Sequence, residues 1–401
     1  MSTFDLKRNR KEIIIIILGI LFISFNLRAP LTAVGSIVDL IKNEYTLNNT
    51  VAGFITTIPL IAFALISPFV AKIANKIGQA KVMMFGLLLI FVSGLFRSYL
   101  GPIGLFLGTA LIGTGIAIGN VVIPGLIKHH FTNKVGIITS IYVTGMCVFA
   151  ALGAGVSIPL ATEFQLGWHH TLAVWVVLAL FTILIWAPQV FKKQVPAQVA
   201  AQAAGVEKTT SVWTDKLAWG VTFFMGIQSL IFYSLVAWLP TIVLSKDFSS
   251  TFASSMAFLF QIMAIPATLV VPTLCDKFKD QRILVVVTTV IYGIGIGLFL
   301  IGTTSTIITI ATILMAIGMG GSISLSIAFI ALRSPDKAKA AELSGMSQSA
   351  GYLFAALGPI LLGLIYDLTN SWTLPIVIFL VLLVLLTLIG IYAGKNITIK
   401  Q

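Results

Sequence analysis

Long runs of apolar residues dominate the chain, and short polar or charged segments interrupt them at fairly regular intervals. A helix needs about 20 apolar residues to cross the hydrocarbon core of a bilayer. Taking glycine, proline and charged residues as the breaks, we predict twelve spans of that length. Their expected limits are 13–41, 50–74, 81–98, 101–128, 135–160, 168–191, 215–244, 250–275, 282–301, 304–332, 339–367 and 371–394.

The composition supports a membrane protein. The 401 residues are 58% hydrophobic and only 9% charged, with a mean hydropathy of +1.05, whereas soluble domains carry roughly a quarter charged residues. Only helices or closed barrels satisfy their backbone hydrogen bonds in lipid. Barrel strands are about 10 residues long and alternate in polarity, so unbroken apolar runs such as 373–394 favour helices. We therefore expect an all-α integral membrane protein whose basic N-terminus leads into a retained first helix.

The distribution of charge predicts the orientation of the helices. If the N-terminus is cytoplasmic and the loops alternate, 21 of the 25 lysines and arginines fall on cytoplasmic segments, as the positive-inside rule requires. Lys42, Arg97 and Lys246 are left outside, and Arg28 is left within the membrane. Both termini are thus expected in the cytoplasm. The net charge of +12 reflects this topology, and we expect the lipid bilayer as a partner and no nucleic acid.

The chain also contains an internal repeat. The polar, Ala- and Gln-rich stretch 192–214 separates an N-terminal six-helix bundle, 1–191, from a C-terminal one, 215–401. The pentapeptide FAALG occurs at 149–153 and again at 354–358, and Gly113 and Gly115 match Gly318 and Gly320 at the same offset. Two parallel, pseudo-symmetric six-helix bundles with a central cytoplasmic loop describe the major facilitator architecture. Such transporters bind substrate near the midplane, between the repeats.

A loop signature supports that resemblance. The major facilitator pattern G-x-x-x-D-[RK]-x-G-[RK]-[RK], found between helices 2 and 3, is similar to AKIANKIGQAK at 71–81, although Asn75 replaces the aspartate. The second copy, PTLCDKFKDQR at 272–282, keeps the Asp-Lys pair. The resemblance implies a role in gating for Asn75, Lys76, Gly78, Lys81, Asp276 and Lys277. Pro30 is expected to kink the first helix and to contribute to the same motion.

A narrower resemblance covers nearly the whole chain. The segments NLRAPLTAVG (26–35), GIAIGNVVIPGLIKHHF (115–131) and GMSQSAGYLFAALGPILLGLIYD (345–367) are similar to the cyanate/2-nitroimidazole permease family. Ser36 departs from the proline expected there. This resemblance implies a bacterial inner-membrane, multi-pass transporter of small molecules that are often anionic or carry a nitro group. It leaves the particular substrate open.

Arg28 is the most unusual residue of the first span. It lies about halfway along the span, near the bilayer midplane, where a charge costs about 2.5–3.5 kcal/mol on insertion scales. Ser24 and Thr32 stand one helical turn on either side and predict a polar stripe. One interpretation is a permanent structural pair with a carboxylate or helix-end carbonyls. We favour an anionic substrate as the partner, because no acidic residue is expected at this depth and guanidinium binds planar anions.

Other polar residues fall at mid-depth on helices that line major facilitator cavities. Any one of them could instead hold helices together, at about 0.6 kcal/mol each, but the set offers donors and aromatic rings for a small ligand. With Arg28, we expect the substrate site to be formed by Ser24, Thr32, Asn120, Tyr142, Gln228, Tyr233, Gln261, Gln348 and Tyr352.

These observations favour a secondary-active or facilitative transporter that moves a small, anionic solute by alternating access, with Arg28 as the anchor. The solute would be cyanate-like, a carboxylate or a nitro compound. Efflux of drugs or nitroimidazoles through the same fold is the alternative. A membrane-embedded enzyme is less favoured because paired carboxylates and large exterior loops are missing from the sequence. We expect no enzymatic activity, cofactor or metal, and a functional monomer. Direction of transport stays open, as does coupling, for which Asp39 or Asp367 are candidates.

Overall fold

The computed structural model describes residues 10–131, 135–191, 211–335 and 337–399, and every regular element within these ranges is helical. In this part of the chain, twelve segments are long and apolar enough to cross a membrane. They match the twelve predicted spans one to one, and the expected all-α membrane fold is confirmed.

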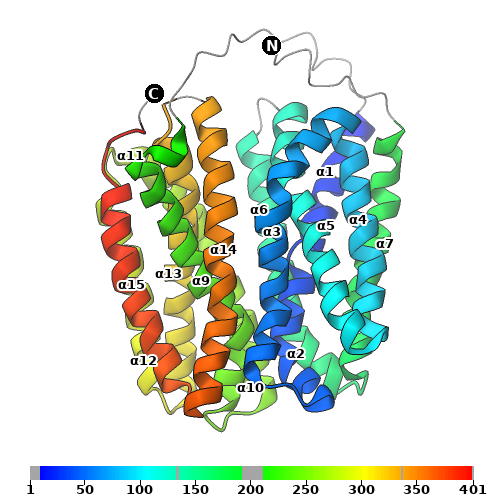
Figure 1. Cartoon of the computed structure of the whole chain (residues 1–401), viewed down its shortest axis with the longest axis vertical. Helices are drawn as coiled ribbons and strands as arrows, with labels where there is room; N and C mark the ends of the chain where they lie inside the picture. Colours follow the sequence, from blue (N-terminus) through cyan, green and yellow to red (C-terminus); the bar gives the residue numbers. More distant parts are fainter. Residues whose placement is uncertain (1–9, 132–134, 192–210, 336, 400–401) are drawn as a thin grey trace.

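The helices form two groups that lie on opposite sides of the molecule (Figure 1). We call the first group the first half; it consists of α1 (Arg10–Asn26), α2 (Ala29–Tyr45), α3 (Asn49–Ile77), α4 (Gln79–Tyr99), α5 (Gly101–His130), α6 (Val135–Thr162) and α7 (Gly167–Val190). The second half consists of a short 3-10 helix, η2 (Val212–Thr214), and of α9 (Lys216–Leu244), α10 (Ser250–Ile262), α11 (Ile265–Lys277), α12 (Arg282–Ile301), α13 (Ser305–Leu332), α14 (Lys337–Thr369) and α15 (Thr373–Ala393). Most of the predicted central loop, residues 192–210, lies outside the described residues, so the domain boundary stays a prediction.

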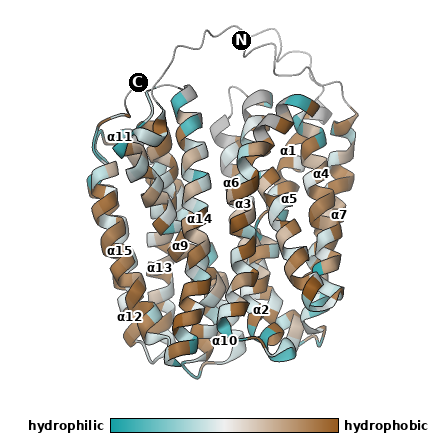
Figure 2. Ribbon diagram, in the orientation of Figure 1, coloured by the Kyte–Doolittle hydropathy of each residue, from teal (hydrophilic) through white to brown (hydrophobic). Residues whose placement is uncertain are grey.

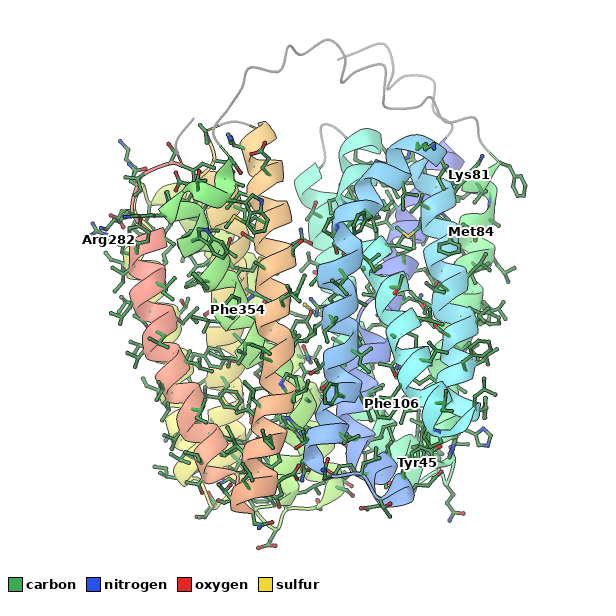
Figure 3. The ribbon with its side chains drawn as sticks, viewed as in Figure 1. Tyr45, Lys81, Met84, Phe106, Arg282 and Phe354 are labelled. Carbon is green, nitrogen blue, oxygen red and sulfur yellow. The ribbon has the colours of Figure 1, made fainter. Side chains whose placement is uncertain are left out.

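The two ends of the bundle can be distinguished. Helix α1 begins and α15 ends at the same end, which we call the near end; Lys81 and Arg282 lie there, whereas Tyr45 lies at the opposite, far end (Figures 1 and 3). Hydrophobic residues cover most of the helices (Figure 2). Large side chains such as Ile103, Ile283 and Leu388 are exposed, as expected where the surrounding solvent is lipid.

In two of the twelve spans the helix is interrupted, and in both a proline follows the interruption at the same distance. Helix α1 ends at Asn26 and α2 begins at Ala29; α10 ends at Ile262 and α11 begins at Ile265. Pro30 and Pro266 are each four residues beyond the last helical residue. Since proline has no N–H to donate to the carbonyl four residues earlier, each helix ends where that bond would have formed.

The repeat seen in the sequence has a structural counterpart. Gly153, from the first FAALG copy, packs against the backbone of Ala29 at the start of α2, where an added Cβ would lie 2.8 Å from the carbonyl oxygen. Gly358, its counterpart in the second copy, packs on Leu230 and Ser234 of α9, where an added Cβ would clash with the Ser234 Oγ. Each half therefore uses a glycine of its fifth span to bring the first span close.

Candidate substrate site between the two halves

Arg28 lies in the break between α1 and α2 and reaches the second half. Its Nη1 donates a hydrogen bond of 2.9 Å to the hydroxyl of Tyr233 on α9. The guanidinium carbon is 5.5 Å from the ring centroid of Phe232 and 5.7 Å from that of Tyr233, within the range of cation–π attraction. Among the described residues, no carboxylate forms a salt bridge with Arg28. The described contacts of the guanidinium are therefore with a tyrosine hydroxyl and two aromatic rings.

More tyrosines surround the same guanidinium. Tyr142 of α6 and Tyr352 of α14 both lie close enough to experience the charge of Arg28. The Tyr352 ring is 6.3 Å from the Tyr233 ring, and it meets Phe63 of α3 edge-on at 5.4 Å. Four of the predicted residues, Arg28, Tyr142, Tyr233 and Tyr352, thus come together from both halves near the middle of the first span, Ile13–Tyr45.

The break interrupts the helix that carries the predicted stripe of Ser24, Arg28 and Thr32. Arg28 bonds to Tyr233 of α9, and Ser24 and Thr32 pack on glycines of α6. Ser24 donates to the Leu21 carbonyl at 2.6 Å, and Thr32 donates weakly to that of Arg28 at 3.3 Å. Both are buried against glycines of α6, Gly145 and Gly153. Their contacts are those of helix packing.

The hydrogen bonds of Asn120 and Gln348 stay within their own half. The Tyr142 hydroxyl donates to Asn120 at 3.5 Å, and Gln348 donates to Ser344 at 3.0 Å. Gln261 is buried on α10.

Gln228 differs, because its Nε2 donates to Ser229 at 2.7 Å while its buried Oε1 has no hydrogen-bond partner. A buried acceptor of this kind is costly unless it is paired, so Gln228 has an unfilled capacity to accept a hydrogen bond.

The residues of the loop signature lie at the near end, away from this site. Lys76, Lys81 and Lys277 are exposed, and Gly78 links α3 to α4 with a φ of 98°, a conformation that favours glycine. The side chains of Asn75 and Asp276 lie outside the described residues. Their role in gating stays a prediction.

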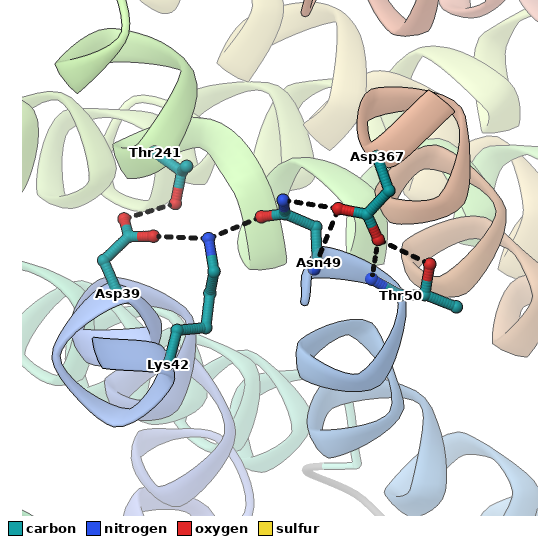
Figure 4. A network of polar contacts seen from close by, with 6 residues as sticks. All are labelled: Asp39, Lys42, Asn49, Thr50, Thr241 and Asp367. Carbon is teal, nitrogen blue, oxygen red and sulfur yellow. Dashed lines mark hydrogen bonds and ion pairs between the residues drawn. The ribbon is translucent and has the colours of Figure 1, made fainter. Parts of the chain in front are cut away.

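A polar network at the far end joins the two halves (Figure 4). Asp367, near the end of α14, accepts hydrogen bonds from the backbone N–H groups of Asn49 and Thr50 at 3.0 and 2.7 Å. It also accepts from their side chains, at 2.7 and 2.6 Å. These are the first two residues of α3, whose N–H groups have no partner within the helix. A carboxylate of one half therefore caps a helix of the other, with favourable charge.

The same network continues to α2 and α9. Asp39 pairs with Lys42 at 3.2 Å and accepts a hydrogen bond of 2.8 Å from the Thr241 hydroxyl of the second half. Lys42 in turn donates to Asn49 at 2.5 Å. Asp39 and Asp367 are the residues that the sequence suggested for coupling. Their partners in the other half lie 202 and more than 300 residues away, so no local pattern in the sequence indicates these contacts.

The halves are in contact at the far end and apart toward the near end. A Cβ on Gly35 would clash with the Val236 carbonyl oxygen, and one on Gly53 would lie 2.7 Å from that of Pro359, so backbones of opposite halves nearly touch. On the near-end side of the two breaks, a cavity of about 600 Å³ lies between α1, α6 and α11, where Leu21, Phe25 and Leu269 line it. The close backbone contacts between the halves thus lie toward the far end, and the cavity lies toward the near end.

This arrangement defines a membrane transporter with two opposed halves, and comparison with known proteins agrees. The family model described as Major Facilitator Superfamily matches residues 15–338 and 248–396. The chain belongs to this superfamily, and within it to the cyanate/2-nitroimidazole permease family.

Several relatives are named as transporters. The 2-nitroimidazole transporter of Escherichia coli K12 is 38% identical over 96% of this chain and 97% of its own length. "Uncharacterized transporter YycB" of Bacillus subtilis is 43% identical over 95% and 94%. The E. coli cyanate transport protein CynX is 24% identical over 89% and 91%.

Solved structures show the same fold. The nucleoside transporter NupG, in a mutant form, matches with a TM-score of 0.76 at 15% identity, over 94% of this chain and 100% of that one. A bacterial homologue of the lysosomal transporter Spinster matches with a TM-score of 0.75 at 14% identity, over 96% and 97%. Both the fold and the relatives are those of transporters, and the protein is a multi-pass membrane permease.

Proposed function

We propose that this protein transports a small anionic solute by alternating access, and that Arg28 binds the solute's negative charge. The observation that carries the proposal is the environment of Arg28. A guanidinium at mid-membrane is bound by neutral groups of the opposite half, in a setting where charges are normally paired. An anion that enters between the halves would complete the pairing.

The geometry favours a planar solute. Guanidinium donates two parallel hydrogen bonds to a carboxylate or a similar pair of oxygens, and the surrounding tyrosine and phenylalanine rings offer flat apolar faces. The relatives named for cyanate and 2-nitroimidazole handle molecules that are small and unsaturated. A cyanate-like ion, a small carboxylate or a nitro compound fits this chemistry.

The orientation follows from charge. We place the near end in the cytoplasm of a bacterial cell, with both termini there, as the distribution of basic residues predicts; the far-end network would then close the outer side, and the cavity of about 600 Å³ would lie on the cytoplasmic side. Solute would be released or captured on that side while the far-end network stays intact. A single chain contains both halves of the site, so we propose a functional monomer.

Efflux of nitro compounds is the second candidate. The 38% identity to the 2-nitroimidazole transporter favours it. A neutral nitroimidazole would depend on the aromatic rings more than on the charge of Arg28. Variants of Arg28 therefore separate the two proposals.

The test is uptake by purified protein in proteoliposomes. A panel of labelled cyanate, small carboxylates and 2-nitroimidazole is compared with and without a pH gradient, for the parent, Arg28→Ala and Arg28→Lys. We expect Arg28→Ala to lose at least about 90% of anion uptake and Arg28→Lys to keep a reduced rate, because lysine retains the charge without the planar fork. Arg282→Lys, on the surface and paired with Asp280, is the matched control. Full anion transport by both Arg28 variants would refute the anchor.

A further inference from the structure

Arg97 is a second arginine buried in the first half. The sequence predicted it at the end of the third span, on the outside. The structure instead places it within the last turn of α4, with 1% of its surface exposed. It is therefore a charge inside the helix bundle, close to the far end.

Arg97 differs from the other cations that are buried to the same extent. Arg333 is 2% exposed and donates to the carbonyls of Ala393 and Gly394 and to the side chain of Gln281. Lys339, equally buried, pairs with Glu342 at 3.1 Å. Arg97 makes a single hydrogen bond, from Nη1 to the Pro30 carbonyl at 2.8 Å, and its buried Nε has no partner.

This guanidinium lacks the counter-charge that burial requires. It has five N–H donors, and a buried charge is costly unless it is both paired and hydrogen-bonded. No carboxylate of the described residues forms a salt bridge with it. The buried Arg97 guanidinium therefore requires an anion as its partner.

A small cavity adjoins Arg97, with room for a single small particle. Its volume is about 10 Å³, close to the minimum that holds one water-sized particle. Pro30, Thr56 and Thr109 of the first half line it together with Tyr233 and Val236 of the second, and the remaining lining is apolar. Thr56 and Thr109 donate to carbonyls of their own helices, so Arg97 is the charged donor that faces the space.

We propose that this cavity binds a monatomic, halide-sized anion, with chloride as the abundant physiological example, through the Arg97 guanidinium. The volume excludes a planar organic anion, and a neutral water would leave the charge unbalanced. Because α9 supplies part of the wall, the ion is enclosed only while the halves are closed at the far end. Bound halide therefore stabilises that state. The inference does not depend on which solute Arg28 carries.

The first test measures thermal unfolding of the purified protein in detergent, with sodium chloride or bromide replacing sodium gluconate at constant ionic strength. We expect a saturable rise of about 3 °C in the unfolding midpoint with either halide, since a ligand that binds only the folded state stabilises it. Arg97→Gln should lose the response, while Arg282→Gln, an exposed site, should keep it. A midpoint insensitive to halide in the parent protein would overturn the proposal, as would an unchanged response in Arg97→Gln.

The second test does not require a variant to fold. Crystals of the parent protein grown in sodium bromide should show an anomalous peak within about 4 Å of the Arg97 guanidinium, at hydrogen-bonding range for a large anion. A cavity that contains only water density under saturating bromide would show that no such site exists. Bromide bound at Arg28 and not at Arg97 would likewise contradict the assignment.

Discussion

At the scale of single residues, the groups that contact Arg28 distinguish it from the other arginines. Arg282 pairs with a carboxylate on the surface and Arg333 with backbone carbonyls, whereas Arg28 is held by a tyrosine hydroxyl and two rings. The sequence predicted the depth of Arg28 because one charge within an apolar run is visible locally. It predicted Tyr233 only as one of several mid-depth polar residues, since the contact spans 205 positions.

Tyr233→Phe tests this contact. The substitution keeps the ring against the guanidinium and removes the hydroxyl that orients it, so we expect KM for the transported anion to rise about tenfold, or about 1.4 kcal/mol, with a smaller change in maximal rate. Initial uptake rates over a range of solute concentrations measure both quantities. Tyr99→Phe, whose hydroxyl contacts His170 at an exposed site, should behave as the parent. An unchanged KM would mean that Tyr233 does not position Arg28.

At the scale of helices, the breaks were only partly predictable. The sequence indicated a kink at Pro30, but proline alone does not specify a break: Pro59, Pro159 and Pro359 lie inside continuous helices. A glycine of a neighbouring helix packs against each broken span, as one also does against the continuous helices at Pro59 and Pro359. A Cβ on Gly153 would lie 2.8 Å from the Ala29 carbonyl oxygen, and one on Gly320 would lie 2.5 Å from that of Ala264. Such pairs of distant segments cannot be inferred from one sequence.

The break before Pro266 separates a part of the span that packs closely on α6 from one that makes few contacts with it. Gly155 of α6 meets Phe258 of α10, whereas Leu269 of α11 lies across the cavity of about 600 Å³ from α6. Pro266→Ala would restore the N–H that bonds to the Ile262 carbonyl and straighten the span. We expect the protein to unfold at a higher temperature and transport to slow about tenfold, equivalent to about 1.4 kcal/mol in the barrier.

Scanning fluorimetry and uptake rates measure these two effects. Pro272→Ala, inside the continuous helix α11, is the control and should change transport little. A Pro266→Ala variant that transports at the parental rate would show that the break is not needed for the motion.

At the scale of the whole molecule, the sequence predicted the twelve spans because local hydropathy indicates them. It predicted the repeat because the same motifs occur in both halves. It could not predict which end is closed, since every state of a transporter has the same sequence. The far end is closed by the polar network, through its contacts between α2, α3, α9 and α14. Asp367 is its centre, with four hydrogen bonds to the start of α3.

Asp367→Asn should weaken the closure. The amide replaces one acceptor with a donor that faces the N–H groups of α3, which costs about 1–3 kcal/mol and shifts the population toward opening at the far end. The reporter is Thr57→Cys, a position 1% exposed between the halves, in a background of Cys147→Ala and Cys275→Ala. We expect its labelling by a membrane-impermeant maleimide from outside the cell to accelerate about tenfold. Asp280→Asn, on the surface, is the control, and an equal labelling rate in both variants would exclude a gating role for Asp367.

The central claim is that Arg28 binds the charge of the transported anion. Equilibrium binding of the solute identified in proteoliposomes, measured by calorimetry on purified parent, Arg28→Lys and Arg28→Met, tests it most directly. We expect Kd to rise about tenfold with lysine and at least about a hundredfold with methionine, about 1.4 and 2.7 kcal/mol. The Arg282→Lys protein should bind as the parent does. Equal affinity in the parent and Arg28→Met would contradict the claim, whatever happened to the rate of transport.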